Sequence, residues 1–149
     1  MREKLPRIAA LRVLQDMRLS LRFTDGWNTI VSLANFVPKF KSLAPLTRSE
    51  VFARGKTQEW GTGVTWDDEG PLSIASTTLY RLAAEQSDSD ARRFDAWMIT
   101  NGLSAARAAE SLGMTRRSII HYRTGSRPIP RYVMLACRGW EAEQALVHQ

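Results

Sequence analysis

The chain has 149 residues, of which 44% are hydrophobic and 24% charged, and its formal net charge at pH 7 is +6. This composition is typical of a globular protein and excludes a chain that is disordered throughout. The sequence has no run of about eighteen apolar residues, and its start lacks the apolar block of a secretion signal. We therefore expect neither a membrane span nor export, and predict a cytoplasmic protein.

Residues that could carry catalysis or bind a metal are few. Cys137 is the single cysteine, which excludes an internal disulfide and a zinc site of paired thiolates. The two histidines, His121 and His148, leave few candidates for a triad. The acidic residues 67–69 are interpreted as a solvated turn, and residues 61–63 lack the further glycine and the helix of a phosphate loop. We predict no catalytic residue, no metal and no cofactor, and a protein that is not an enzyme.

The first half of the chain carries strand signals. Residues 18–24 alternate between apolar and polar side chains, which is typical of a half-buried strand. Asp25-Gly26 predicts a tight hairpin, after which residues 27–33 return as a strand. Residues 8–14 could supply an earlier strand that pairs with this hairpin. The first hairpin strand is expected to bury Leu19, Leu21 and Phe23.

The register of this hairpin has two alternatives. A simple two-residue loop places Leu21 opposite Ile30. A one-residue bulge instead turns the other set of alternating side chains toward the core. That set consists of Trp27, Thr29, Val31 and Leu33. The pattern alone does not choose between them.

The segment that follows predicts a loose connection and then more strands. Residues 34–46 contain two prolines and predict a connection with one helical turn, and Thr47 is expected to cap a short turn through Phe52. Strand signals return at residues 54–60 and 64–66, and residues 67–71 close them with a polar turn.

A helix is predicted over residues 73–84, with Leu79, Leu82 and Ala83 as its apolar positions. One helix on a small antiparallel sheet makes an α+β domain, here residues 1–84, for dimerisation, sensing or partner binding. Its core is expected to contain the tryptophans Trp27, Trp60 and Trp66. If these were exposed together, they would instead indicate a surface for a ligand or a partner.

Residues 85–90 are polar and contain no hydrophobic side chain, so they are predicted to link this domain to a second one over residues 91–149. The second domain should begin with a helix that buries Phe94, Trp97 and Met98. Its last helix should start near Pro130. The buried face of that last helix is predicted to hold Val133, Ala136, Cys137 and Trp140.

The positive charge is confined to one segment. Residues 104–138 hold seven arginines and one acid, Glu110, so the segment carries 7 − 1 = +6, which equals the charge of the whole chain. A basic surface of this kind suits an anionic partner. Its arginines are Arg107, Arg116, Arg117, Arg123, Arg127, Arg131 and Arg138.

The same segment predicts two short helices with a tight turn between them. Gly113 can adopt the left-handed conformation that ends a helix, and Thr115 is a good N-cap for a second helix over residues 116–123. Small residues would let the helices cross closely, as in a helix-turn-helix. The apolar stripe of the first helix follows the spacing i, i+3, i+4 and i+7 at Ala105, Ala108, Ala109 and Leu112.

In such a unit the second helix enters the major groove and the first bridges the DNA backbone. Ile119 and Tyr122 should face inward. Arg116 and Arg117 lie on the outer face at the start of the helix, where they can reach guanine or phosphate. Residues at helix starts suit phosphate oxygens, and the later arginines, Arg131 included, are expected to contact phosphate. The predicted DNA-binding residues are Ser104, Thr115, Arg116, Arg117, Ser118, Ile120, His121, Arg123, Thr124 and Arg127.

Several stretches together resemble the Xre or lambda-repressor-like helix-turn-helix family over about residues 92–140. These are Asn101-Gly102-Leu103-Ser104, Ala108-Ala109, residues 112–119 and the Gly-Ser-Arg-Pro-Ile-Pro run at 125–130. The resemblance implies a compact helical bundle, operator binding and, often, action as a dimer. The family commonly has Gln after the serine, where it touches DNA. This chain has Ala105 there, so the arginines must carry more of the binding.

The first half resembles a small bacterial α+β family of undefined function through Phe23-Thr24-Asp25-Gly26, the strand pair over residues 52–66 and Leu79-Tyr80. Such domains occur alone or fused to a helix-turn-helix, and some resemble components of toxin–antitoxin pairs. We therefore predict a two-domain transcriptional regulator that binds double-stranded DNA as a homodimer. The alternative is an antitoxin-like interaction module whose N-terminal domain binds a partner protein.

Overall fold

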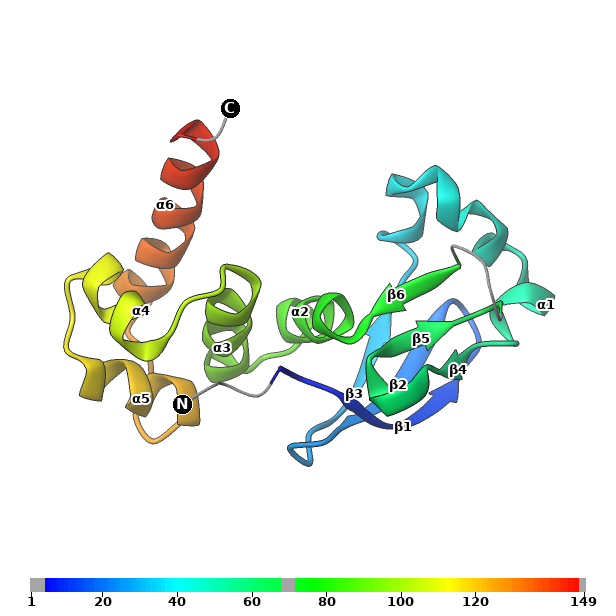
Figure 1. Cartoon of the computed structure of the whole chain (residues 1–149), viewed down its shortest axis with the longest axis horizontal. Coiled ribbons are helices and arrows are strands. Elements are labelled where there is room, and N and C mark those ends of the chain that lie inside the picture. The colour runs from blue at the N-terminus through cyan, green and yellow to red at the C-terminus, as the bar shows by residue number, and fades with distance from the viewer. Residues whose placement is uncertain (1–4, 68–71, 148–149) are drawn as a thin grey trace. The chain divides into compact units, whose positions relative to one another are not determined.

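The computed structural model describes residues 5–67 and 72–147 (Figure 1). The chain divides into two compact units, one over residues 2–86 and one over residues 87–149. The first combines strands and helices, and the described part of the second consists of helices and their connections. The predicted α+β class is therefore confirmed. Over the described ranges, none of the helices combines the length and the apolar character that a membrane span needs.

The first unit begins with a three-stranded antiparallel sheet. Its strands are β1 (Ile8–Val13), β2 (Arg18–Phe23) and β3 (Asn28–Ser32), in the order β1-β2-β3. The alternation in β2 has the predicted effect, because its three apolar side chains are buried and its arginines are exposed. The strands at residues 8–14, 18–24 and 27–33 are thus confirmed to within a residue or two.

The hairpin between β2 and β3 adopts the bulged alternative. Leu21 pairs with Thr29 and not with Ile30, and the Phe23 N–H donates to the Trp27 carbonyl at 2.9 Å, which closes a three-residue loop. Gly26 supplies the left-handed backbone of this loop, with φ 95°. The shift of one residue leaves Ile30 52% exposed. It turns the other set inward, with Val31 and Leu33 buried and Trp27 and Thr29 half-buried.

The connection after β3 contains two 3₁₀ helices and a short α-helix: η1 (Val37–Lys39), η2 (Lys41–Thr47) and α1 (Ser49–Phe52). The prediction that Thr47 caps the last of these is wrong. The residue before α1 is Arg48, and the Thr47 hydroxyl donates to the Ala44 carbonyl at 2.8 Å. The threonine therefore closes the end of η2 and does not begin the next helix.

A second three-stranded sheet follows, made of β4 (Lys56–Thr57), β5 (Gly63–Thr65) and β6 (Ser73–Ala75). The strand expected over residues 54–60 is cut short, because η3 (Glu59–Gly61) takes over with left-handed backbone at Trp60 (φ 64°) and Gly61 (φ 68°). Of the polar turn expected at residues 67–71, only Asp67 lies within the described residues.

Residues 73–75 form strand β6 and not the start of a helix, which corrects the prediction of a helix over residues 73–84. The helix is α2 (Ser76–Gln86), and its predicted apolar positions are buried. Tyr80 of α2 packs edge-on against Phe23, with ring centroids 5.2 Å apart, and joins the helix to the first sheet. Since α2 contacts both β3 and β5, it covers parts of both sheets.

The three tryptophans of this unit differ in burial. Trp66 is buried and its Nε1–H donates to the Phe52 carbonyl at 2.9 Å. Trp27 is half-buried against Phe23. Trp60 is 78% exposed, so its predicted place in the core is wrong. Its backbone is left-handed, with φ 64°, and it lies in η3 between strands β4 and β5.

The predicted linker over residues 85–90 is shorter than expected, because α2 continues through Gln86 and the next helix begins at Asp90. The Gln86 side chain accepts a hydrogen bond from the Ser32 N–H at 2.8 Å and donates to the Ser32 carbonyl at 2.9 Å. It therefore pairs with the backbone of edge strand β3, as a neighbouring strand would.

The second unit contains α3 (Asp90–Thr100), α4 (Ala105–Leu112), α5 (Arg116–Thr124) and α6 (Arg131–Val147). As predicted, α3 buries its aromatic and methionine side chains, and Ser89 caps it by accepting from the Arg92 N–H. The unit's core combines residues of all four helices with Leu103 of the connection between α3 and α4. Its members are Phe94, Trp97, Met98, Leu103, Ala108, Ala109, Ile119, Tyr122, Val133 and Cys137.

Helix α6 buries Val133 and Cys137 as predicted, and Trp140 is half-buried against the edge of Trp97. Ala136 is exposed, which corrects its predicted place on the buried face. Burial, aided by the charge of Glu141, raises the pKa of the Cys137 thiol to about 12. The thiol therefore stays protonated at neutral pH and acts as a small apolar side chain in the core.

Candidate nucleic-acid interface

Helices α4 and α5 are joined by a tight turn that local residues determine. Gly113 adopts left-handed backbone with φ 67°, its N–H donates to the Glu110 carbonyl, and the Met114 N–H donates to the Ala109 carbonyl at 2.9 Å. This pair of bonds is the Schellman arrangement that satisfies the last carbonyls of a helix. A side chain at residue 113 would be strained, so the turn depends on the absence of a Cβ.

Both helices begin at a capping hydroxyl, as predicted for Thr115. Ser104 Oγ accepts from the Arg107 N–H at 3.2 Å, and Thr115 Oγ1 accepts from the Ser118 N–H at 3.1 Å. Thr115 Oγ1 also donates to Ser118 Oγ at 3.0 Å. These bonds fix the first turns of α4 and α5, and they leave the Ser118 hydroxyl proton to donate elsewhere.

The inner face of the two helices is the one that the spacing predicts. Ala108 and Ala109 of α4 and Ile119 and Tyr122 of α5 are all buried. Tyr122 meets Phe94 of α3 edge-on, with ring centroids 5.9 Å apart. The small side chains on α4 let α5 approach closely, and the aromatic contact holds α5 against α3.

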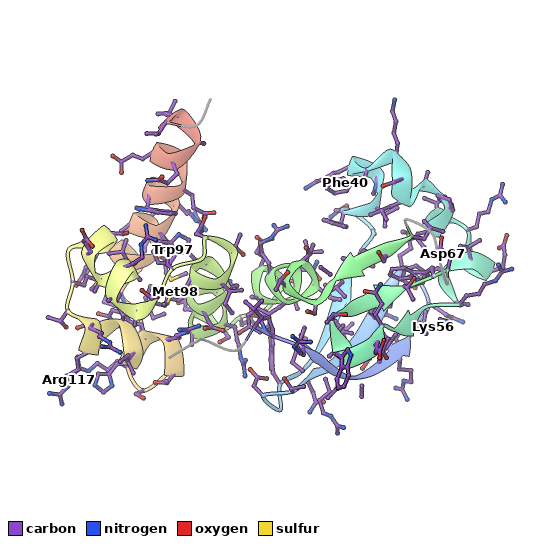
Figure 2. All side chains as sticks on the ribbon, in the orientation of Figure 1. Phe40, Lys56, Asp67, Trp97, Met98 and Arg117 are labelled. Atoms are coloured by element: carbon purple, nitrogen blue, oxygen red, sulfur yellow. The ribbon has the colours of Figure 1, made fainter. Side chains whose placement is uncertain are left out.

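The outer face of α5 presents the residues expected there. Arg116, Arg117 and Thr124 are exposed, Ile120 is 44% exposed and His121 is half-buried. Figure 2 shows Arg117 on the outside of the helical unit, whereas Trp97 and Met98 lie inside it. The predicted inner and outer faces of α5 are therefore the observed ones.

Two of the predicted contacts already have local hydrogen bonds. The Thr124 hydroxyl donates to the Ile120 carbonyl at 2.9 Å and lies 2.8 Å from Ser126 Oγ. Thr115 is occupied by its cap. At these two positions the hydroxyls mainly stabilise the ends of α5, and the side chains that extend outward from the helix are the arginines.

In the part of the chain that the structure describes, no ion pair forms at Arg116, Arg117 or Arg127. Arg116 and Arg117 occupy the first turn of α5, where the helix dipole adds further positive potential. The result is a concentrated positive surface at the leading end of an exposed helix, suited to an anion.

Arg123 is engaged differently. Its Nε–H donates to Asp95 Oδ1 of α3, and the two side chains are only 20% and 19% exposed. The ion pair ties α5 to α3 across 28 residues of sequence, and neither residue's local spacing signals it. Asp95 is therefore a residue that the sequence pattern missed, and it positions the helix that carries the arginines.

Replacing Asp95 with Ala is expected to destabilise the helical unit by about 1–3 kcal/mol, because it leaves a mostly buried guanidinium without its carboxylate. Asp90→Ala is the matched control: Asp90 pairs with Arg93 at 2.9 Å, but the pair is 48% and 35% exposed, so a loss below about 1 kcal/mol is expected. Urea unfolding of both variants measures the difference. Equal losses would contradict the structural role of the Arg123–Asp95 pair.

Residues 8–85 match a family described as proteins of unknown function, DUF2442, and this span is more than half of the chain. The chain belongs to the DUF2442 family. The DUF2442 match covers the strands and α2, in agreement with the predicted likeness of the first half to a family of undefined function. It ends before α3 begins, so the resemblance of the helical unit to lambda-repressor-like proteins stays a prediction.

A solved relative covers both units of this DUF2442 protein. The chain is similar to the crystal structure of "Putative DNA Binding Protein NE0471" from Nitrosomonas europaea, with 36% identity and a TM-score of 0.65. The similarity covers 95% of this chain and 91% of that one, and thus includes α3–α6. No curated protein matches the chain.

Proposed function

We propose that the chain is a sequence-specific transcriptional regulator that reads double-stranded DNA with α5. One observation carries the proposal: Arg116 and Arg117 stand side by side at the exposed start of α5, without an ion-pair partner among the described residues. A guanidinium can bond bidentately to the O6 and N7 atoms of guanine, which is the commonest specific contact to a base. Two adjacent arginines can therefore contact the base edges of a short DNA sequence.

The geometry of the caps supports this orientation. In a helix-turn-helix the second helix enters the major groove with its N-terminal end toward the bases, and the first helix crosses the backbone. At the starts of α4 and α5, the Ser104 and Thr115 hydroxyls cap the N–H groups of Arg107 and Ser118, and the earlier N–H groups of each first turn suit phosphate oxygens. The proton of the Ser118 hydroxyl is a further donor for phosphate.

The remaining positive charge supplies affinity without sequence preference. Arg127 follows α5 in an exposed loop, and Arg131 begins α6 as an exposed side chain. Contacts of such residues to phosphate release counterions, so DNA binding should weaken steeply as salt rises. Arg123 has a smaller part in this account, since its guanidinium is held by Asp95.

One comparison and one resemblance predicted from the sequence favour the proposal. The similar protein of Nitrosomonas europaea carries the name of a putative DNA binding protein. The stretches at residues 101–104, 112–119 and 125–130 resemble lambda-repressor-like proteins, which often act as dimers on paired half-sites. A dimer of this chain would bind two half-sites about 34 Å apart, one turn of the duplex.

Selection from a pool of random duplexes tests the proposal. The parent chain is expected to enrich a short sequence that contains guanine and recurs at a spacing of about one helical turn. The protein with Gly113→Val, which strains the left-handed turn between α4 and α5, serves as a control and should enrich nothing. A parent chain that recovers no sequence above the random pool would refute sequence-specific binding.

A second candidate function, an antitoxin-like interaction module, is favoured by Trp60. Its indole is 78% exposed on left-handed backbone, and its carbonyl accepts from Arg7 Nη1 at 3.3 Å. Exposed tryptophans often anchor protein interfaces. A stoichiometric complex with a second protein that Trp60→Ala abolishes, together with no enriched duplex, would favour this function over DNA reading.

A further inference from the structure

An exposed apolar line runs along α6, outside the site described above. Its members are spaced by three and four residues in turn, which is the a and d pattern of a coiled coil. The large ones are exposed to solvent: Tyr132 by 68%, Leu135 by 48% and Leu146 by 71%. Between them lie two small exposed residues, Gly139 and Ala142.

This line faces away from the core of its own unit. At 100° per residue, Tyr132, Leu135 and Gly139 point to the side of α6 opposite Val133 and Cys137, which are buried. The C-terminal half of α6 also extends past the other helices of the unit (Figure 1). The apolar line is therefore not explained by packing within the helical unit.

Gly139 gives an independent indication of a close neighbour. A glycine inside a helix costs about 1 kcal/mol relative to alanine. A Cβ added at this position would meet no atom within 4 Å among the described residues, so no contact in that part of the chain requires the glycine. With Ala142 one turn later, it allows another helix to approach α6 closely at the middle of the line.

The charges beside the line select the partner. Arg131 and Arg138 flank one side at g positions, and Glu143 flanks the other side at an e position. In a parallel pair, each g residue meets the e residue five positions further on in the partner, so Arg138 of each copy meets Glu143 of the other. An antiparallel pair would instead place the arginines opposite one another.

We propose that α6 pairs in parallel with α6 of a second copy of this chain, through Tyr132, Leu135, Gly139, Ala142 and Leu146, with Arg138–Glu143 ion pairs across both edges. The interface is isologous, so two identical surfaces close the pair. It does not rest on the proposed DNA binding, and it is measured without DNA.

Sedimentation equilibrium of the full chain tests the apolar part. The parent is expected to dimerise reversibly, and Leu135→Glu to weaken the dimer at least about 100-fold, because two leucines leave the interface and two charges enter it. Leu135 is exposed within its own chain, so circular dichroism and thermal unfolding at high dilution should match the parent. A parent that remains monomeric up to about 1 mM overturns the proposal, as does a Leu135→Glu protein that dimerises like the parent.

A charge exchange tests the partner and its direction. Arg138→Glu and Glu143→Arg are each expected to weaken the dimer about tenfold, and the double variant to restore it, since the pairs form again with reversed signs. Glu141→Arg makes the same charge change away from the line and should leave dimerisation unchanged. The two exchanged residues are five apart on one helix and do not face each other, so rescue requires the second copy. Failure of the double variant to recover overturns the parallel pairing.

Discussion

Replacing Arg116 and Arg117 together with Ala is expected to abolish the preference of the chain for its selected duplex over a random duplex of equal length. Both side chains are exposed at the start of α5 without carboxylate partners in the described residues, so their removal leaves the fold intact. If each makes a bidentate contact to guanine, the loss of discrimination is about 1–3 kcal/mol per arginine. Fluorescence anisotropy titrations with both duplexes measure it.

Arg127→Ala is the matched control, since it removes the same side chain from an exposed loop beyond the start of α5. We expect it to weaken binding to both duplexes alike and to lower the slope of log K against log salt by about one unit. If the double variant and Arg127→Ala both bind the two duplexes like the parent, the outer face of α5 is not the DNA-binding surface.

Replacing Ile119 with Ala is expected to destabilise the helical unit by about 2–5 kcal/mol, because the side chain is fully buried where α5 packs on its neighbours. A loss of that size is comparable with the total stability of a small unit. The variant should therefore lose the cooperative unfolding transition of the helical unit and, with it, DNA binding. Differential scanning calorimetry and circular dichroism record the unfolding transition, and fluorescence anisotropy records DNA binding.

Ile120→Ala is the matched control for Ile119→Ala, because it makes the same substitution at an exposed position. Ile120→Ala removes an isoleucine that is 44% exposed, so the unfolding free energy of the unit should change by less than about 1 kcal/mol. Its effect should instead be on DNA, since Ile120 lies on the outer face of α5. Similar destabilisation by the two variants would contradict the assigned faces.

The helical unit was largely predictable because its signals are local. A glycine at residue 113, a threonine at residue 115 and the alanine spacing of α4 act within one or two turns, and each is observed in its expected role. Ser89 caps α3 and Gly102 ends it for the same reason. Capping and steric preferences depend on near neighbours, so the sequence pattern carries them directly.

The first unit was less predictable, because its pairing depends on contacts that are distant in sequence. Ser73–Ala75 forms strand β6 because it pairs with β5. The local pattern of apolar residues does not separate this stretch from α2, which follows it directly. The hairpin register follows from a loop that the Asp25-Gly26 pair alone does not specify. Gln86, 54 residues from Ser32, completes an edge strand that no local pattern reveals.

In the candidate interface, too, local features were predictable and contacts distant in sequence were not. The outward arginines at the start of α5 follow from helical periodicity and capping, whereas the engagement of Arg123 by Asp95 of α3 is a tertiary contact. Ala136 was predicted on the buried face of α6 but is exposed, because alanine is found on both buried and exposed faces of helices. Burial of alanine contributes little free energy, so its position on α6 is determined by larger neighbours such as Val133 and Cys137.

Amide-resolved NMR of the chain with its selected duplex tests the central claim, that the start of α5 reads DNA. We expect the amide shifts of residues 104–107 and 115–121 to change most, those of residues 8–85 to remain near their free values, and the changes at residues 115–121 to shrink in the variant with Arg116→Ala and Arg117→Ala. Changes that concentrate on the strands of the DUF2442 region and spare α5 would contradict the account.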